Sequence, residues 1–225
     1  MSAYYPMMVN LSGKRCVVVG GGPVAERKTL GLLDGGAGAL IVVAPRATAQ
    51  LEKLAAAGSI ALRRREYRDS DAEGAFLLIA ASDDRALNAR LAEYAESRGI
   101  LVNTADLGDR GSFITPSVVR RGELVIALTT GGASPALTAL LKRKLDGEYG
   151  PAYERFVDRL HALRKRVLAK VGDPGLRASV LRLAAEELPN RETWDDFGNA
   201  GKQVPDELEI QHWMIRLLEA AERGR

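Results

Sequence analysis

Three small residues near the start of the chain have a spacing that suits one kind of chemistry. Gly20, Gly22 and Ala25 form the pattern G-x-G-x-x-A, which dinucleotide-binding proteins use at the end of their first strand. A side chain at Gly20 would crowd the tight turn, and one at Gly22 would block approaching phosphates. The N–H groups of the following helical turn favour negative charge. The pattern therefore predicts a diphosphate-binding turn, and the alternative is a glycine-rich turn that binds nothing.

Alternating apolar and helical segments surround this turn. Apolar runs predict strands at Cys16–Val19, Leu40–Val43, Ile60–Leu62, Phe76–Ala81 and Ile100–Asn103. Helical patterns separate them, at Val24–Leu33, at Ala47–Gly58 and after the cap at Ser82-Asp83. Strands that alternate with helices at this spacing predict an α/β fold with a Rossmann-like, doubly wound parallel sheet.

Ligands of such sheets bind beyond the carboxyl ends of the strands. The candidates for cofactor binding at these ends are Gly20, Gly22, Pro23, Val24, Pro45, Arg46, Ser82 and Asp83. Asp106 follows the fifth strand and is a candidate catalytic residue, with a loop or helix cap as the alternative. The second strand ends in Pro45 and Arg46, where NAD-binding proteins usually carry an acid. Arg46 either accepts the 2′-phosphate of NADP or is a solvated surface residue, and the residues alone leave both open.

The pattern changes after Asp106. We expect strands at Phe113–Val119 and Leu124–Leu128, a turn at Arg121-Gly122 and a helix at Ala136–Leu145. A hairpin and a helix bury little core alone, so we expect this segment to pack against a second copy in a homodimer. Amphipathic helices fill the chain from Pro151 onward. These changes predict a cofactor-binding domain at 1–112, a dimerisation segment at 113–148 and a helical domain at 149–225.

The composition argues against several classes of protein. The 225 residues are 46% hydrophobic and 27% charged, which is typical of a globular chain. A formal net charge of +3 is too small to predict nucleic-acid binding. No apolar run is long enough to span a bilayer and no secretory signal is visible, so we expect a cytoplasmic protein. Cys16 is the only cysteine, and His161 and His212 stand alone, so no resident metal site is predicted.

Four longer motifs resemble those of a known family. They are YPMMVNLSGKRCVVVGGGPVAERK, AASDDRALN, VNTADLGDRGSFITPSVVRRGEL and ALTTGGASPALTALLKRKL, in this order from Tyr5 to about Leu145. The chain resembles the precorrin-2 dehydrogenases, which form the NAD-dependent module of siroheme synthase. The resemblance implies a homodimer that oxidises precorrin-2 to sirohydrochlorin and passes a hydride to NAD⁺. Some family members also insert Fe²⁺ to make siroheme, and the sequence leaves this second activity open.

The resemblance also implies roles for residues. The family's essential aspartate lies in an N-x-x-D motif that matches Asn103-Thr104-Ala105-Asp106, which implies Asp106 as the catalytic base and as a transient contact for Fe²⁺. Family members that use NAD share the missing acid after the second strand, and this favours NAD. The candidates for binding the carboxylate-rich substrate are Arg110, Arg120, Arg121, Thr130 and Ser134. The arginines fit exposed turn charges equally well, and the hydroxyls fit a purely structural turn.

Two other functions are compatible with parts of this pattern. The chain could be a regulatory domain that senses NAD without turnover, but no basic recognition helix or helix-turn-helix is evident. It could also be a chelatase that has lost cofactor binding, but Gly20 and Gly22 are intact. NAD-dependent oxidation of precorrin-2 is therefore the function that the sequence favours.

Overall fold

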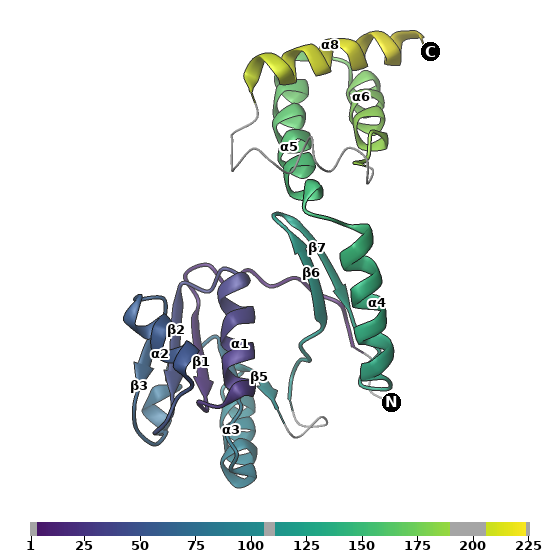
Figure 1. The fold of residues 1–225 in the computed structure, drawn as a ribbon. Helices are drawn as coiled ribbons and strands as arrows, with labels where there is room; N and C mark the ends of the chain where they lie inside the picture. Colours follow the sequence, from purple (N-terminus) through teal and green to yellow (C-terminus); the bar gives the residue numbers. More distant parts are fainter. Residues whose placement is uncertain (1–3, 106–110, 190–205, 224–225) are drawn as a thin grey trace. The chain divides into compact units, whose positions relative to one another are not determined.

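The sheet expected from the sequence lies in the first of two compact units. The computed structural model describes residues 4–105, 111–189 and 206–223, and the chain divides into Met1–Thr115 and Pro116–Arg225. Neighbouring strands of the sheet are parallel, in the order β3-β2-β1-β4-β5 (Figure 1). The strands are β1 (Arg15–Val19), β2 (Ala39–Val43), β3 (Ala61–Arg63), β4 (Leu77–Ala80) and β5 (Leu101–Thr104). The strand order reverses beside β1, as in doubly wound folds, and this confirms the predicted fold class.

Helices cover both faces of this sheet, because successive residues of a strand point to opposite sides. Val18 faces a core that contains residues of α1 and α2, whereas Val17 faces one that contains residues of α3 and Tyr67. The helices are α1 (Pro23–Asp34), α2 (Ala49–Ala56) and α3 (Arg85–Ser97). Val17, Val18 and Val42 are all 0% exposed. Burial on both faces explains why these strands are continuously apolar.

The strand expected over Phe113–Val119 is wrong at its start, because β6 begins only at Ser117. The backbone N–H of Ser112 donates to the carbonyl oxygen of Val102 at 2.9 Å, so the chain first runs back beside β5. Pro116 has no N–H to donate and disfavours strand pairing at its own position. The expected strand therefore divides into a first part that follows the pairing beside β5 and a second part that belongs to β6.

A hairpin and a helix begin the second unit. β6 (Ser117–Arg121) pairs antiparallel with β7 (Leu124–Leu128), and Gly122 in the turn between them has a φ of 57°. Arg121 binds Asp146 of α4 (Pro135–Glu148), with 3.2 Å between Nη2 and Oδ1. No residue of α4, which lies entirely within the described ranges, is buried. The hairpin is thus anchored on a helix that remains open on its other sides.

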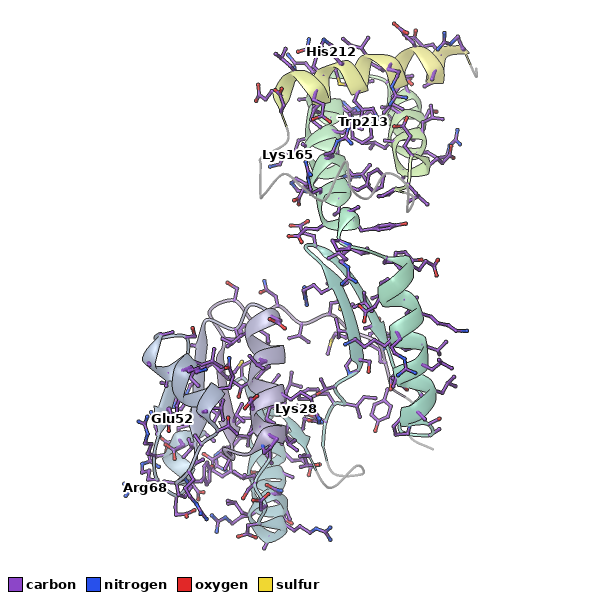
Figure 2. The ribbon with its side chains drawn as sticks, viewed as in Figure 1. Lys28, Glu52, Arg68, Lys165, His212 and Trp213 are labelled. Atoms are coloured by element: carbon purple, nitrogen blue, oxygen red, sulfur yellow. The ribbon has the colours of Figure 1, made fainter. Side chains whose placement is uncertain are left out.

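The helices that follow form a core of their own. They are α5 (Ala152–Lys170), α6 (Pro174–Glu186) and α8 (Glu207–Arg223), and α8 lies across the other two (Figure 1). Trp213 points inward and His212 outward (Figure 2), and the indole Nε1 of Trp213 donates to Glu187 at 2.9 Å. Within the described parts of the chain, no helix combines the length and apolar character needed to cross a membrane.

Candidate functional site

A cavity of about 610 Å³ opens where β1, β2 and β4 end. Its lining includes the predicted cofactor-binding residues Gly20, Gly22, Pro45, Arg46, Ser82 and Asp83. The other two candidates, Pro23 and Val24, are exposed on the first turn of α1 and are outside the lining. Residues from three separate strand ends therefore meet at one edge of the sheet, as the topology requires.

The glycine turn (Gly20–Gly22) is shaped by the main chain around it. A Cβ added to Gly20, whose φ is 128°, would collide with the carbonyl oxygen of Ala81, and one added to Gly21 would collide with that of Arg46. A Cβ added to Gly22 would meet nothing within 4 Å. Close main-chain contacts therefore require glycine at positions 20 and 21. The space beside Gly22 is open, and a ligand can occupy it.

The start of α1 is built to receive negative charge. The side chains of Thr48 and Asp84 accept hydrogen bonds from the first turns of α2 and α3. At α1 the N-cap is Gly22, and no side chain of the described residues caps the first turn. Its N–H groups and the positive end of the helix dipole are thus left facing the glycine turn. A diphosphate fits such a terminus, so the cradle suits a dinucleotide.

A buried amide on α3, that of Asn88, holds the main chain of Ser82 in the cavity lining. Asn88 is 0% exposed. Its Oδ1 accepts from the N–H of Ser82 at 3.1 Å, and its Nδ2 donates to the carbonyl of Ser82 at 2.8 Å. The sequence reasoning missed this residue. The available indication was its position on the face of α3 that also carries the buried Leu91 and Ala95.

We expect Asn88→Ala to lower the free energy of unfolding by about 1–3 kcal/mol, because it leaves two main-chain groups of Ser82 without these partners. Urea unfolding of the variant measures this loss. Arg90→Ala is the control, since Arg90 is exposed on the same helix. Equal unfolding midpoints for the two variants would show that the hydrogen bonds from Asn88 to Ser82 contribute nothing to stability.

A lysine on α1 connects this helix to the end of β5. The Nζ of Lys28 donates to Oδ1 of Asn103 and to Oγ1 of Thr115, both at 2.8 Å, and Lys28 extends from α1 in Figure 2. Burial, assisted by the nearby Arg27, lowers the pKa of Lys28 to about 8. The sequence reasoning missed Lys28 as well. It shares a helical face with the buried Ala25 and Thr29, where a lysine is unexpected.

The stability that Lys28 contributes should rise with pH. The unfolded chain holds this proton up to the ordinary pKa of 10.5, whereas the folded protein releases it near 8. Between these values the unfolded state binds more protons, so the free energy of unfolding increases as pH increases. Urea unfolding below, within and above this window should show the rise in the wild type and lose it in Lys28→Met. Lys53→Met, at an exposed site, should keep it.

The remaining predicted site residues lie outside the described residues or in the second unit of the chain. Asp106 and Arg110 lie outside the described residues. Arg120 is exposed and Arg121 binds Asp146. The Oγ1 of Thr130 accepts from the N–H of Ser134 at 3.1 Å, and Ser134 caps α4. These last contacts shape the turn, and substrate binding by these residues stays a prediction.

The described residues contain no group of three or more His, Cys, Asp or Glu side chains that could hold a metal ion. His161 and His212 are both exposed on their helices.

A cavity of this kind, beneath an uncapped helix at the carboxyl edge of a doubly wound sheet, defines a dinucleotide-binding protein. Two family models match the chain in succession. One is described as NAD(P)-binding and covers residues 7–117, and the other is described as "Sirohaem biosynthesis protein central" and covers residues 121–148. The chain therefore carries an NAD(P)-binding segment that is followed by a segment similar to the central domain of sirohaem biosynthesis proteins.

Individual relatives agree with these two matches. The "Siroheme synthase" of Nitrosococcus oceani is 37% identical over 78% of the chain and 37% of its own length. That of Pseudomonas entomophila is 41% identical over 71% of the chain and 36% of its own length. The chain thus spans little more than a third of these relatives. A solved structure named "SirC, precorrin-2 dehydrogenase" is 25% identical, with a TM-score of 0.70 over 96% of the chain and 100% of its own.

Proposed function

We propose that the chain is an NAD-dependent dehydrogenase that oxidises precorrin-2 to sirohydrochlorin in siroheme biosynthesis. One observation carries the proposal. A glycine-lined cavity fit for a dinucleotide is followed by the sirohaem-specific central segment, in a chain that matches SirC over the whole of that protein. Neither a generic dinucleotide-binding domain nor a chelatase without a cofactor requires both features. The proposal therefore explains the combination with one activity.

Each part of the cavity has a task in this function. The glycine turn and the first turn of α1 would hold the diphosphate of the cofactor, and the loop at Pro45 and Arg46 would flank its ribose. Bound NAD⁺ supplies the hydride acceptor. Oxidation removes two hydrogens from precorrin-2, one as the hydride and one as a proton. Asp106 would accept that proton, as the resemblance implies.

The decisive experiment is an anaerobic incubation of the full chain with precorrin-2 and NAD⁺. We expect NADH to appear together with the colour change of the macrocycle. A protein that binds NAD⁺ without forming NADH would instead be a sensor. A parallel incubation with Fe²⁺ tests the second activity, because metal insertion gives siroheme rather than sirohydrochlorin. Absence of both NAD⁺ binding and NADH would overturn the proposal.

The second unit would supply the substrate contacts and the dimer. Arg120 and Arg121, together with Arg110 of the first unit, would pair with substrate carboxylates, and Thr130 and Ser134 would contact the macrocycle. Support for a homodimer comes from α4, on which Leu137 and Leu140 are 45% and 42% exposed. Light scattering should give twice the 24.2 kDa of one chain. The mass of a single chain would contradict the homodimer.

A further inference from the structure

Three consecutive arginines lie at the end of β3. Arg63 is the last residue of the strand and pairs with Val43 of the cavity lining, and Arg64 and Arg65 follow it. Such a run beside a dinucleotide site would ordinarily suit the 2′-phosphate of NADP, because guanidinium groups bind phosphates in pairs of hydrogen bonds. None of the three belongs to the described lining of the cavity. Each is instead committed to an acidic side chain elsewhere in the same unit.

Asp71 binds two of these arginines. It lies at the end of the short 3-10 helix η1 (Asp69–Asp71), and its side chain is 0% exposed. The Nη1 and Nη2 atoms of Arg65 donate to its two carboxylate oxygens at 2.7 Å each, and Nη1 of Arg63 donates to Oδ1. These bonds, above all those from Arg65, hold the pKa of Asp71 well below its usual range. Asp71 therefore stays ionised and retains both guanidinium groups.

Glu52 binds the third arginine. The Nε of Arg64 donates to Oε1 of Glu52 at 3.2 Å, and a second bond joins Nη2 to Oε2. Glu52 lies on α2 and is labelled in Figure 2. Two carboxylates thus hold the three guanidinium groups, and none of the three arginines belongs to the described lining of the cavity.

The next residue, Glu66, does line the cavity. Its position is held on both sides, since Arg65 donates to its carbonyl oxygen at 2.9 Å and Tyr67 is only 9% exposed. Among the described residues, the charged side chains of the lining are Arg46, Glu66, Asp83 and Asp84. Asp84 is occupied as the cap of α3. The described lining therefore carries more negative than positive charge, although β2 lacks the usual acid.

We propose that Glu66 replaces the missing acid of β2 and makes the cavity select NAD over NADP, with Asp71 and Glu52 as positioning residues that withdraw the three arginines. The inference rests on the proposed cofactor site. A carboxylate accepts hydrogen bonds from ribose hydroxyls but repels a phosphate at the same place. The sequence could not show this, because the acid follows a different strand from the one that usually carries it.

Calorimetric titration of the full chain with NAD⁺ and with NADP⁺ tests the proposal. We expect the wild type to bind NAD⁺ more tightly than NADP⁺. The ratio of the Kd for NADP⁺ to the Kd for NAD⁺ should decrease about tenfold in Glu66→Gln, which corresponds to ~1.4 kcal/mol. Glu73→Gln is the matched control, since Glu73 is exposed and outside the described lining. It should leave the ratio unchanged.

Asp71→Asn should also reduce the ratio, because it frees Arg63 and Arg65 to approach a phosphate. If that variant fails to fold, the Kd ratio of Glu66→Gln still tests the proposal, because Glu66 is exposed and its substitution should not disturb the fold. Equal ratios in the wild type, Glu66→Gln and Glu73→Gln would overturn the inference, as would a wild type that binds NADP⁺ as tightly as NAD⁺. Failure of the wild type to bind either dinucleotide would instead overturn the cofactor site.

Discussion

Gly22→Ala is expected to preserve the fold and to weaken NAD⁺ binding about tenfold to a hundredfold. The φ of Gly22 is −82°, which alanine adopts freely, and its added Cβ would meet nothing within 4 Å. That open space is where the diphosphate would approach the first turn of α1. Loss of one or more hydrogen bonds to a charged group, at about 1.5–3 kcal/mol each, gives the expected range. Titration calorimetry measures the Kd.

Gly21→Ala is the matched comparison, because its Cβ would collide with the carbonyl oxygen of Arg46. This variant should melt at a lower temperature even without ligand. Gly22→Ala should melt at the temperature of the wild type when no ligand is present. It should gain less from NAD⁺, since the stabilisation at a given ligand concentration decreases as the Kd increases. Unchanged NAD⁺ binding in Gly22→Ala would place the dinucleotide somewhere other than the glycine turn.

Asp106→Asn is expected to reduce precorrin-2 turnover about a hundredfold to ten-thousandfold, the usual contribution of a general base. The amide keeps the size of the side chain but cannot take a proton. NAD⁺ should still raise the melting temperature of the variant as it does for the wild type, because the described lining that would hold the cofactor follows β1, β2, β3 and β4. NADH formation and thermal melts measure the two effects separately.

Asp34→Asn serves as the control, since Asp34 is exposed at the far end of α1. Normal turnover in Asp106→Asn would remove this residue from the mechanism. Loss of NAD⁺ binding together with turnover would mean that Asp106 supports the structure of the cofactor site rather than the proton transfer.

The parallel sheet and the glycine turn were predictable from residues close together in the chain. Runs such as Leu40–Val43 are β-branched, short and bounded by turn residues, and β2 begins only one residue earlier. Local sequence suffices here because burial on both faces selects apolar residues at every position of the strand. The positions of Gly20 and Gly22 follow in the same way, since the turn must leave β1 and enter α1 within a few residues.

The polar contacts around the site were not predictable in this way. The helical faces of Lys28 and Asn88 indicate burial, but their importance depends on partners that the fold brings to them, at β5 and at Ser82. The same holds for Arg63 and Arg65, which by sequence resemble a phosphate site and are held instead by Asp71. A buried strand can be predicted from its own apolar residues. A buried charge or amide acquires its role only when long-range folding supplies the group that satisfies it.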